Sequence, residues 1–484
     1  MSPPPDPATL QSAQVSGTSN PLVADYAVTT TGTGTVKVEF GPTNSYGFVT
    51  SEQTTPTGGG TMHILVAGMK QNTLYHMRAV VESPGNQVTD QDRTFQTGTI
   101  PPAMLPNMHL TIPSGQQPSP GVELLSLRGN APNQLESLAI NPGGDIIWYY
   151  NFDPTKGTPM VTKLLPNGHM MVLVTIQGPP VSAAVREIDL AGNTVRQFTM
   201  DDLSQKLHNA GYNLTLVNID HDILLLPNGH LLFITTNTRI IDGATVAGNA
   251  VIDVDENNNP VWVWDAFDHL DIHRRPIYFP DWTHANALFY SASDGNFLLS
   301  LRHQHWVLKI DYQNGGGSGD VLWRLGYQGD FTLQSSTLAD WFYAQHYANI
   351  VSTNTTGDFQ LAVFDNGDFR VLDDNGDTCN GDPNGPPNCY STAAIFDVNE
   401  DTMTAKREFT YTSPYSFWGG VTQRLPNSNI FVDETAPQDL GLQSSRVLEM
   451  TQSNPPTVVW QLEIDNQNSY RTVHLPSLYP DVQW

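Results

Sequence analysis

Short runs of apolar residues occur all along the chain, and turn-forming residues separate them. VKVEFGP from Val36 alternates apolar and polar positions, and LLPNGHMMVLV from Leu164 places an apolar run after a tight turn. These patterns are typical of strands that are buried on one or both faces. Gly (39 residues) and Pro (35 residues) punctuate the runs. We therefore predict an all-β chain with many short strands.

One turn-and-strand unit recurs five times. Its turn contains Gly168, Gly229, Gly295 and Gly357 in the first four copies and Ser428 in the fifth, at spacings of 61, 66, 62 and 71 residues. Asn-Gly and Asp-Gly turns supply the positive φ that tight hairpins need. The unit therefore predicts a hairpin in each copy.

A second unit, an apolar-Asp pair followed by a turn and a strand that often carries Trp, recurs six times. The copies are LAINPGGDIIWYY, VREIDLAGNTVRQF, VIDVDENNNPVWVW, VLKIDYQNGGGSGDVLWRL, IFDVNEDTMTAKREF and VLEMTQSNPPTVVWQL. Two hairpins in each repeat make a four-stranded sheet, and six such sheets in series make a six-bladed β-propeller. The innermost strands of a propeller line a central axis where a ligand can bind.

The first hundred residues have a different pattern. Met69, Thr73 and Tyr75 have the spacing of the tyrosine corner in fibronectin type III modules. We predict a fibronectin-like β-sandwich over residues 1–100, acting as a spacer or as a binding module. The proline-rich segment IPPAMLP marks the boundary, and the propeller takes residues 101–484.

Charge and cysteine content limit the partners and the compartment. The chain has 22 basic and 48 acidic residues, a net charge of -26, which disfavours nucleic acid and anionic membranes as partners. Cys379 and Cys389 flank a turn-rich segment and are expected to form a disulfide, because a metal site needs more ligands. No apolar run is long enough to span a bilayer. The chain also starts without a signal peptide, and its previous removal would agree with the paired cysteines and with a periplasmic or secreted location.

Imidazole, amide and guanidinium side chains occur close together in residues 281–311, DWTHANALFYSASDGNFLLSLRHQHWVLKID. His284 and Asn286 are two residues apart, so on a strand they point to one face. Arg302 and Gln304 are expected to share a face in the same way. Further histidines, His221 and His346, lie in separate segments, and we predict that the set converges on one site.

Neutral histidines beside an arginine suit the chemistry of a sulfate or phosphate ester. Arg302 can bind two oxygens of such a group. One imidazole can attack the central atom while another protonates the leaving oxygen. A metal is disfavoured because the chain has no HExxH spacing and because Arg302 would repel a cation. The cluster of His269, Asp271 and His273 is expected to be a solvated loop.

The stretch DWTHAN…SLRHQHWVLKID, the segment QHYANI followed by VFDNGD, and the repeats resemble bacterial arylsulfate sulfotransferases that use no nucleotide sulfate donor. The resemblance covers about residues 105–484. It implies a six-bladed propeller that transfers a sulfuryl group from one phenol to another by a ping-pong mechanism. It further implies that His346 is the nucleophile that becomes sulfated, and that His221 and His284 bind the sulfuryl oxygens or protonate the phenol. Asn286 and Arg302 would hold the remaining oxygens.

The resemblance also sets expectations for the surroundings of the site. In the family a disulfide precedes the nucleophile, whereas Cys379 and Cys389 follow VFDNGD here, so their bridge is expected to be structural. The segment DWFYAQH differs from the Thr and Trp usual in the family, which affects acceptor preference. Neighbouring aromatic residues are expected either to stack on the substrate ring or to pack in the core. They are Trp282, Trp341, Phe342 and Tyr343.

Small aryl sulfates and phenols are the expected partners, with no cofactor and with a homodimer as a candidate assembly. An aryl sulfate hydrolase on the same scaffold is one alternative. A quinone-cofactor dehydrogenase is another, although those proteins usually have more blades and adjacent cysteines. A propeller that serves only as a binding scaffold is the third, because fold alone does not determine function.

Overall fold

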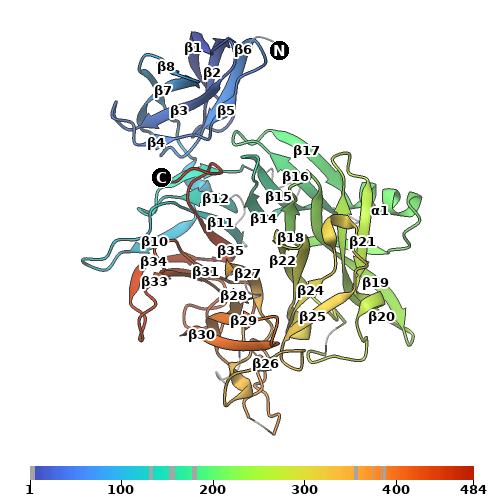
Figure 1. The fold of residues 1–484 in the computed structure, drawn as a ribbon. Coiled ribbons are helices and arrows are strands. Elements are labelled where there is room, and N and C mark those ends of the chain that lie inside the picture. The colour runs from blue at the N-terminus through green and yellow to red at the C-terminus, as the bar shows by residue number, and fades with distance from the viewer. Residues whose placement is uncertain are drawn as a thin grey trace.

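The computed structural model describes residues 6–129, 134–151, 158–176, 182–278, 280–353, 358–373, 375–382, 384 and 389–484. Almost all regular structure in these residues is β-strand, as Figure 1 shows, so the all-β prediction is confirmed. Among the described helices, none has the length and apolar character needed to cross a membrane.

Two antiparallel sheets form the N-terminal part of the structure. The first contains β1 (Thr9–Gly17), β2 (Ala24–Thr31) and β6 (Gly59–Val66). The second contains β3 (Thr35–Gly41), β4 (Phe48–Val49), β5 (Gln53–Thr54), β7 (Leu74–Ser83), β8 (Asn86–Thr89) and β9 (Arg93–Gln96). Both sheets contribute to one core, and the hydroxyl of Tyr75 accepts a hydrogen bond of 3.0 Å from the backbone amide of Lys70. This is the bond that a tyrosine corner makes.

Six further sheets follow, each built on four antiparallel strands. In spatial order, each from its inner strand outward, they are as follows. The first has β35 (Gln467–Leu475), β11 (Val122–Gly129), β12 (Ser137–Ile140) and β13 (Ile146–Tyr149); the second has β14 (Thr158–Leu164), β15 (Met170–Ile176), β16 (Ser182–Ile188) and β17 (Thr194–Thr199); and the third has β18 (Leu216–Leu225), β19 (Leu231–Ile241), β20 (Ala244–Val254) and β21 (Pro260–Asp265). The fourth has β22 (Ala285–Ser291), β23 (Asn296–Leu301), β24 (Trp306–Ile310) and β25 (Val321–Gly326); the fifth has β27 (His346–Thr353), β28 (Asp358–Asp365), β29 (Ser391–Asn399) and β30 (Thr404–Ser413); and the sixth has β31 (Val421–Arg424), β32 (Ile430–Thr435), β33 (Ser445–Met450) and β34 (Val458–Asp465). Two outer strands extend this set, β10 (Asn107–Thr111) on β34 and β26 (Thr332–Leu333), which is parallel to β30.

The two sequence repeats correspond to the two hairpins within these sheets. The first unit joins the first and second strands, and its turn has the predicted positive φ at Gly168 (84°), Gly229 (85°), Gly295 (71°) and Ser428 (71°). The copy at Gly357 lies outside the described residues. The second unit joins the third and fourth strands of each sheet in the same way.

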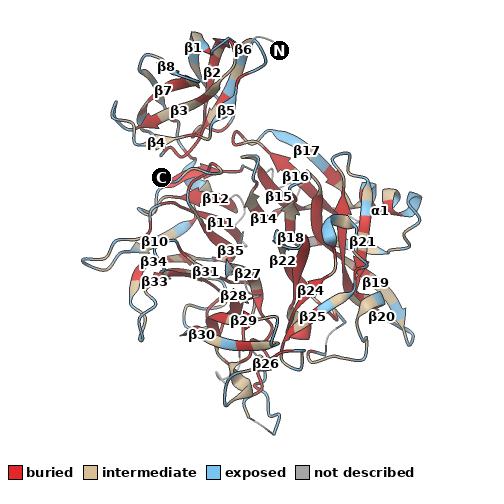
Figure 2. Cartoon of the chain, in the orientation of Figure 1, coloured by how far each residue is buried: buried red, intermediate tan, exposed pale blue. Residues whose placement is uncertain are grey.

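The inner strands of the six sheets contact one another in a closed order. β14 contacts β18, and the series continues through β22, β27, β31 and β35 and returns to β14. The last strand, β35, pairs antiparallel with β11, so that Leu475 lies opposite Val122. Strands such as β24 are buried on both faces, whereas β2 alternates between buried and partly buried residues (Figure 2). The six sheets are therefore linked to one another through their inner strands.

Within the described parts of the chain, helices are few and lie in the connections. They are α1 (Met200–Asn209), α2 (Ala266–His269), and the 3₁₀ turns η1 (Pro102–Met104), η2 (Arg302–Gln304), η3 (Gln313–Gly315) and η4 (Leu338–Asp340). The helix-prone segment DDLSQKLHN forms α1, which begins at a capping box between Thr199 and Asp202.

The end of the chain contacts the N-terminal sheets. The hydroxyl of Tyr479 accepts a hydrogen bond of 2.7 Å from the amide of Ala67, and the indole of Trp484 donates one of 3.0 Å to the carbonyl of Val49. These contacts are part of a core that both regions share.

Candidate active site

The histidines predicted from separate segments do converge. The rings of His221 and His284 are 4.8 Å apart, and His284 stacks on His303 at 4.6 Å. Tyr470 connects this group to His346, because its ring lies 5.9 Å from His221 and 6.1 Å from His346. These residues come from or directly adjoin the inner strands β18, β22, β27 and β35 and the turn η2. The predicted convergence is thus present in the structure.

Two of these histidines have an unusual, left-handed backbone conformation. His221 has a φ of 65° at an irregularity in β18, and His284 has a φ of 49° directly before β22. A left-handed conformation is uncommon for residues other than glycine and is found often at functional sites. His284 therefore does not share the regular strand geometry with Asn286 that the sequence suggested.

Arg302 lies at the start of η2, and most of its guanidinium is engaged. Its Nη1 donates to Nε2 of His303 at 2.5 Å, and its Nη2 donates to Asp368 and, at 2.8 Å, to the carbonyl of Phe417. Asp368 also accepts a hydrogen bond from the hydroxyl of Tyr415. The Nε atom of Arg302 is buried and has no hydrogen-bond partner among the described residues. This N–H is therefore an unsatisfied buried donor among the described residues.

The buried carboxylate of Asp368 has an unusual proton affinity. Burial raises its pKa to about 6, although Arg302 acts in the opposite direction. His303, in contrast, is neutral, because burial and the charge of Arg302 lower its pKa to about 3. A neutral His303 agrees with an Nε2 that accepts a hydrogen bond from Arg302.

His346, the candidate nucleophile, is buried with 3% of its surface exposed. Its Nδ1 is 2.7 Å from Oδ1 of Asn366, and the amide of Gly419 donates to its Nε2 at 3.3 Å. Burial first, and then the charge of Arg302, hold the pKa of His346 well below its usual value. The ring is therefore neutral at physiological pH and carries a lone pair on Nε2, as nucleophilic attack requires.

Asn286, in β22 two residues after His284, is fully buried. Its Nδ2 donates to the carbonyl of Gln345 at 2.7 Å, and its Oδ1 has no hydrogen-bond partner among the described residues. Its backbone carbonyl accepts from Arg471, which forms an ion pair with Asp222 at 3.0 Å. Lys163 pairs with the same carboxylate. Asn286 is thus fixed at the site by a buried charge cluster.

One group of described residues has a geometry that would suit a metal. Ligand atoms of Asp281, His284 and His303 lie within 4.8 Å of one another. Both ring nitrogens of His303 are already engaged, Nε2 by Arg302 and Nδ1 by the carbonyl of Asp281, while the Asp281 carboxylate binds Nδ1 of His284. The atoms that would bind a metal are therefore used in hydrogen bonds, and the positive charge of the adjacent Arg302 opposes binding of a cation.

The prediction that Arg302 and Gln304 share one strand face is wrong. The two residues lie in a 3₁₀ turn, and the amide of Gln304 donates to the carbonyl of Trp282 at 2.8 Å. A turn of this kind rotates successive side chains by about 120°, so Gln304 points away from the guanidinium.

The expectation of a solvated loop holds for two of the three residues at His269, Asp271 and His273. Asp271 and His273 are exposed, whereas His269 ends α2 and stacks on Trp264 at 5.5 Å.

The aromatic residues named from the sequence pack in the protein core. All four are at most 3% exposed, and they belong to two core clusters. They are Trp282, Trp341, Phe342 and Tyr343. Trp418 instead lies at the site, partly exposed and stacked on Tyr470 at 6.2 Å. Sequence reasoning missed His303, Asn366, Asp368 and these two aromatic residues.

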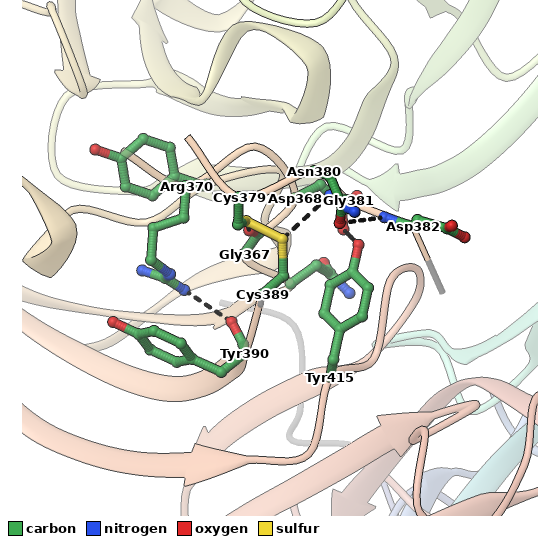
Figure 3. Close-up of a disulfide and its surroundings, with 12 residues drawn as sticks. Gly367, Asp368, Arg370, Cys379, Asn380, Gly381, Asp382, Cys389, Tyr390 and Tyr415 are labelled. Atoms are coloured by element: carbon green, nitrogen blue, oxygen red, sulfur yellow. Dashed lines mark hydrogen bonds between the residues drawn. A yellow bond between two sulfur atoms is a disulfide. The ribbon is translucent and has the colours of Figure 1, made fainter. Parts of the chain in front are cut away.

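The predicted disulfide is present and adjoins the residues that hold Arg302. Cys379 and Cys389 are bonded, and Figure 3 shows Tyr415 and Asp368 beside them. Tyr415 packs against both sulfur-bearing residues. The bridge thus supports the wall of the site, which the sequence did not indicate. A cleft of about 1420 Å³ is lined by residues of the N-terminal sheets, by the turns around Gly168 and Ala191, and by the end of the chain, and by none of the site residues.

Comparisons with known proteins agree with this chemistry. The model of the family described as Arylsulfotransferase (ASST) matches residues 118–472. The arylsulfate sulfotransferase AssT of Escherichia coli O6:H1 is 24% identical over 292 residues, which are 46% of this chain and 46% of that protein. The match thus spans about half the length of this relative.

Similar solved structures were also found. A Dyadobacter fermentans protein of unknown function covers 72% of this chain and 100% of its own, at 10% identity and a TM-score of 0.34. A Synechocystis apocarotenoid oxygenase mutant covers 98% and 97%, at 10% identity and a TM-score of 0.33. TM-scores this low carry no argument about this chain.

Proposed function

Because the chain belongs to the arylsulfotransferase (ASST) family, we propose that it transfers a sulfuryl group from an aryl sulfate to a phenol through a sulfated His346. The observation that carries the proposal is the convergence of a neutral, buried His346 with His221, His284 and Arg302. A neutral imidazole supplies the nucleophile, and the guanidinium supplies positive charge for the sulfuryl oxygens.

In the first half-reaction, Nε2 of His346 gives up its 3.3 Å hydrogen bond from the amide of Gly419 and attacks the sulfur of the donor. The N–S bond forms while the S–O bond to the aryl group breaks, and the electron pair leaves with the phenolate oxygen. Negative charge spreads over the non-bridging oxygens in a loose transition state. The positive charge of Arg302, close enough to His346 to lower its pKa, stabilises these oxygens. His221 or His284 gives a proton to the departing phenolate.

The second half-reaction is the reverse of the first, with a new phenol as acceptor. The histidine that gave up its proton, His221 or His284, removes the proton of this phenol, and the phenol oxygen attacks sulfur and breaks the N–S bond to His346. Asn286 contributes a fixed amide at the site. Aryl esters suit this site because phenols ionise near pH 10 and leave more readily than alcohols. Trp418 and Tyr470 supply aromatic surface beside His346. The cycle requires no cofactor.

We further propose that the six sheets are the blades of a propeller over residues 101–484, with the site at the inner strands. The closed order of contacts among these strands and the pairing of β35 with β11 support this arrangement. Residues 1–100 would form the fibronectin-like sandwich. The disulfide agrees with a periplasmic or secreted location. The homodimer stays a prediction.

Release of nitrophenol from 4-nitrophenyl sulfate tests the function, with and without phenol. The transferase requires phenol for turnover and forms phenyl sulfate, whereas release at the same rate without phenol would identify a hydrolase. His346→Ala should abolish turnover, while the control His273→Ala, in the solvated loop, should retain it. Absence of release from the wild type would favour a binding scaffold.

A further inference from the structure

The segment VFDNGD ends β28 and continues into a turn beside the site, and the chemistry above gives it no role. Asn366 and Asp368, two residues apart in this turn, are both buried. Asp368 binds Arg302, and Asn366 binds His346. One turn thus contacts both the candidate nucleophile and the candidate oxyanion holder.

The orientation of the Asn366 amide follows from its other contacts. Its Nδ2 donates to the backbone carbonyls of Ser416 at 2.7 Å and Gly419 at 3.1 Å. Both carbonyls can only accept, so the nitrogen of the amide must face them and the oxygen must face His346. Exchange of the two amide atoms would place an oxygen against two carbonyl oxygens.

This orientation determines where His346 carries its proton. The oxygen of Asn366 only accepts, so Nδ1 of His346, 2.7 Å away, must be the donor. Nε2 then has the lone pair, in agreement with the amide of Gly419 that donates to it. The tautomer is thus the one that a nucleophilic Nε2 requires.

We propose that Asn366 is a positioning residue that holds His346 in the Nδ1–H tautomer and so presents the Nε2 lone pair to the sulfuryl donor. This inference rests on the proposed function. An amide serves this purpose better than a carboxylate would. A carboxylate in the same place would stabilise the imidazolium and consume the lone pair at moderately acidic pH.

Charged and titratable groups around His346 define what Asn366→Asp would change. Arg302 from η2, His284 next to β22 and His221 from β18 all disfavour a proton on His346. Tyr470 faces the ring from β35. Each stays in place in the variant, so the new carboxylate is the one added charge. It should raise the pKa of His346.

The test is the burst of nitrophenol in a single turnover, measured from about pH 5 to about pH 9. Asn366→Asp should move the acidic limb of the burst rate upward by about one pH unit or more and recover most of the rate at high pH. Asn366→Leu, which cannot accept the Nδ1 proton, should lose about 100-fold at every pH. Asn375→Asp is the control, because Asn375 is exposed in the following loop.

An equal loss in both Asn366 variants, with the pH profile unmoved, would overturn the proposal in favour of a structural role. If neither variant folds, nitrogen-15 spectra of histidine-labelled wild type, assigned with His346→Gln, still decide. The proposal expects Nδ1–H on His346, and Nε2–H would refute it. A wild type without a burst, or an active His346→Ala variant, would instead refute the proposed function.

Discussion

Asp368 provides a thermodynamic test of how Arg302 is held. The pKa of this buried carboxyl stands at about 6, against 3.8 for an ordinary Asp. One pKa unit corresponds to about 1.4 kcal/mol, so ionisation of Asp368 costs the folded state about 3 kcal/mol more than the unfolded chain. Between about pH 4 and pH 6 the folded state therefore binds a proton that the unfolded chain has released. The free energy of unfolding should fall as the pH rises through this window.

The substitution Asp368→Asn removes the titratable carboxyl group and keeps a side chain of similar shape. Urea unfolding at a series of pH values gives the free energy of unfolding of both proteins. The free energy of unfolding of the wild type, relative to that of the variant, should fall by about 2 kcal/mol from pH 4 to pH 7. Asp377→Asn, at an exposed carboxylate nearby, is the control and should show no such shift. A difference that is flat with pH would refute the burial argument and the assignment of charge around Arg302.

Other predictions concern the walls of the site. Gly420→Ala should lower the free energy of unfolding by about 2 kcal/mol or more, because its Cβ would lie 2.3 Å from the ring of Phe364 and its φ is +100°. Gly316→Ala, with 3.5 Å to the nearest atom, is the control in the same thermal melts; equal losses in both would contradict the packing argument. Removal of both cysteines, Cys379→Ser with Cys389→Ser, should cost about 3 kcal/mol and raise KM for the donor, because Tyr415 packs on the bridge and binds Asp368. An unchanged KM in steady-state assays would show that the bridge acts on stability alone.

The repeats in the sequence predicted the sheets because hairpin turns have strict backbone requirements. Gly168, Gly229 and Gly295 all adopt the positive φ that their turns demand. The first unit occurs five times and the second six times. The structure explains the mismatch, since β35 comes from the end of the chain and reaches β11 without a hairpin. Periodicity along the chain cannot reveal such a long-range pairing.

The candidate site residues that could be predicted from the sequence are those in the quoted sequence motifs. His221, His284, Arg302 and His346 gather as expected, because their segments adjoin inner strands. The left-handed backbone of His284 and the 3₁₀ turn at Arg302 depend on tertiary contacts and have no local signal. Asn366 lies in the VFDNGD motif, but the orientation of its amide depends on two backbone carbonyls from a distant segment, those of Ser416 and Gly419.

The central claim is a covalent sulfohistidine at His346, and mass spectrometry of the enzyme after reaction with 4-nitrophenyl sulfate without phenol tests it most directly. The account predicts a peptide containing His346 that gains the mass of one SO₃ group and loses it when phenol is added. A wild-type burst with the adduct on another residue, or with no adduct on the enzyme, would contradict the account.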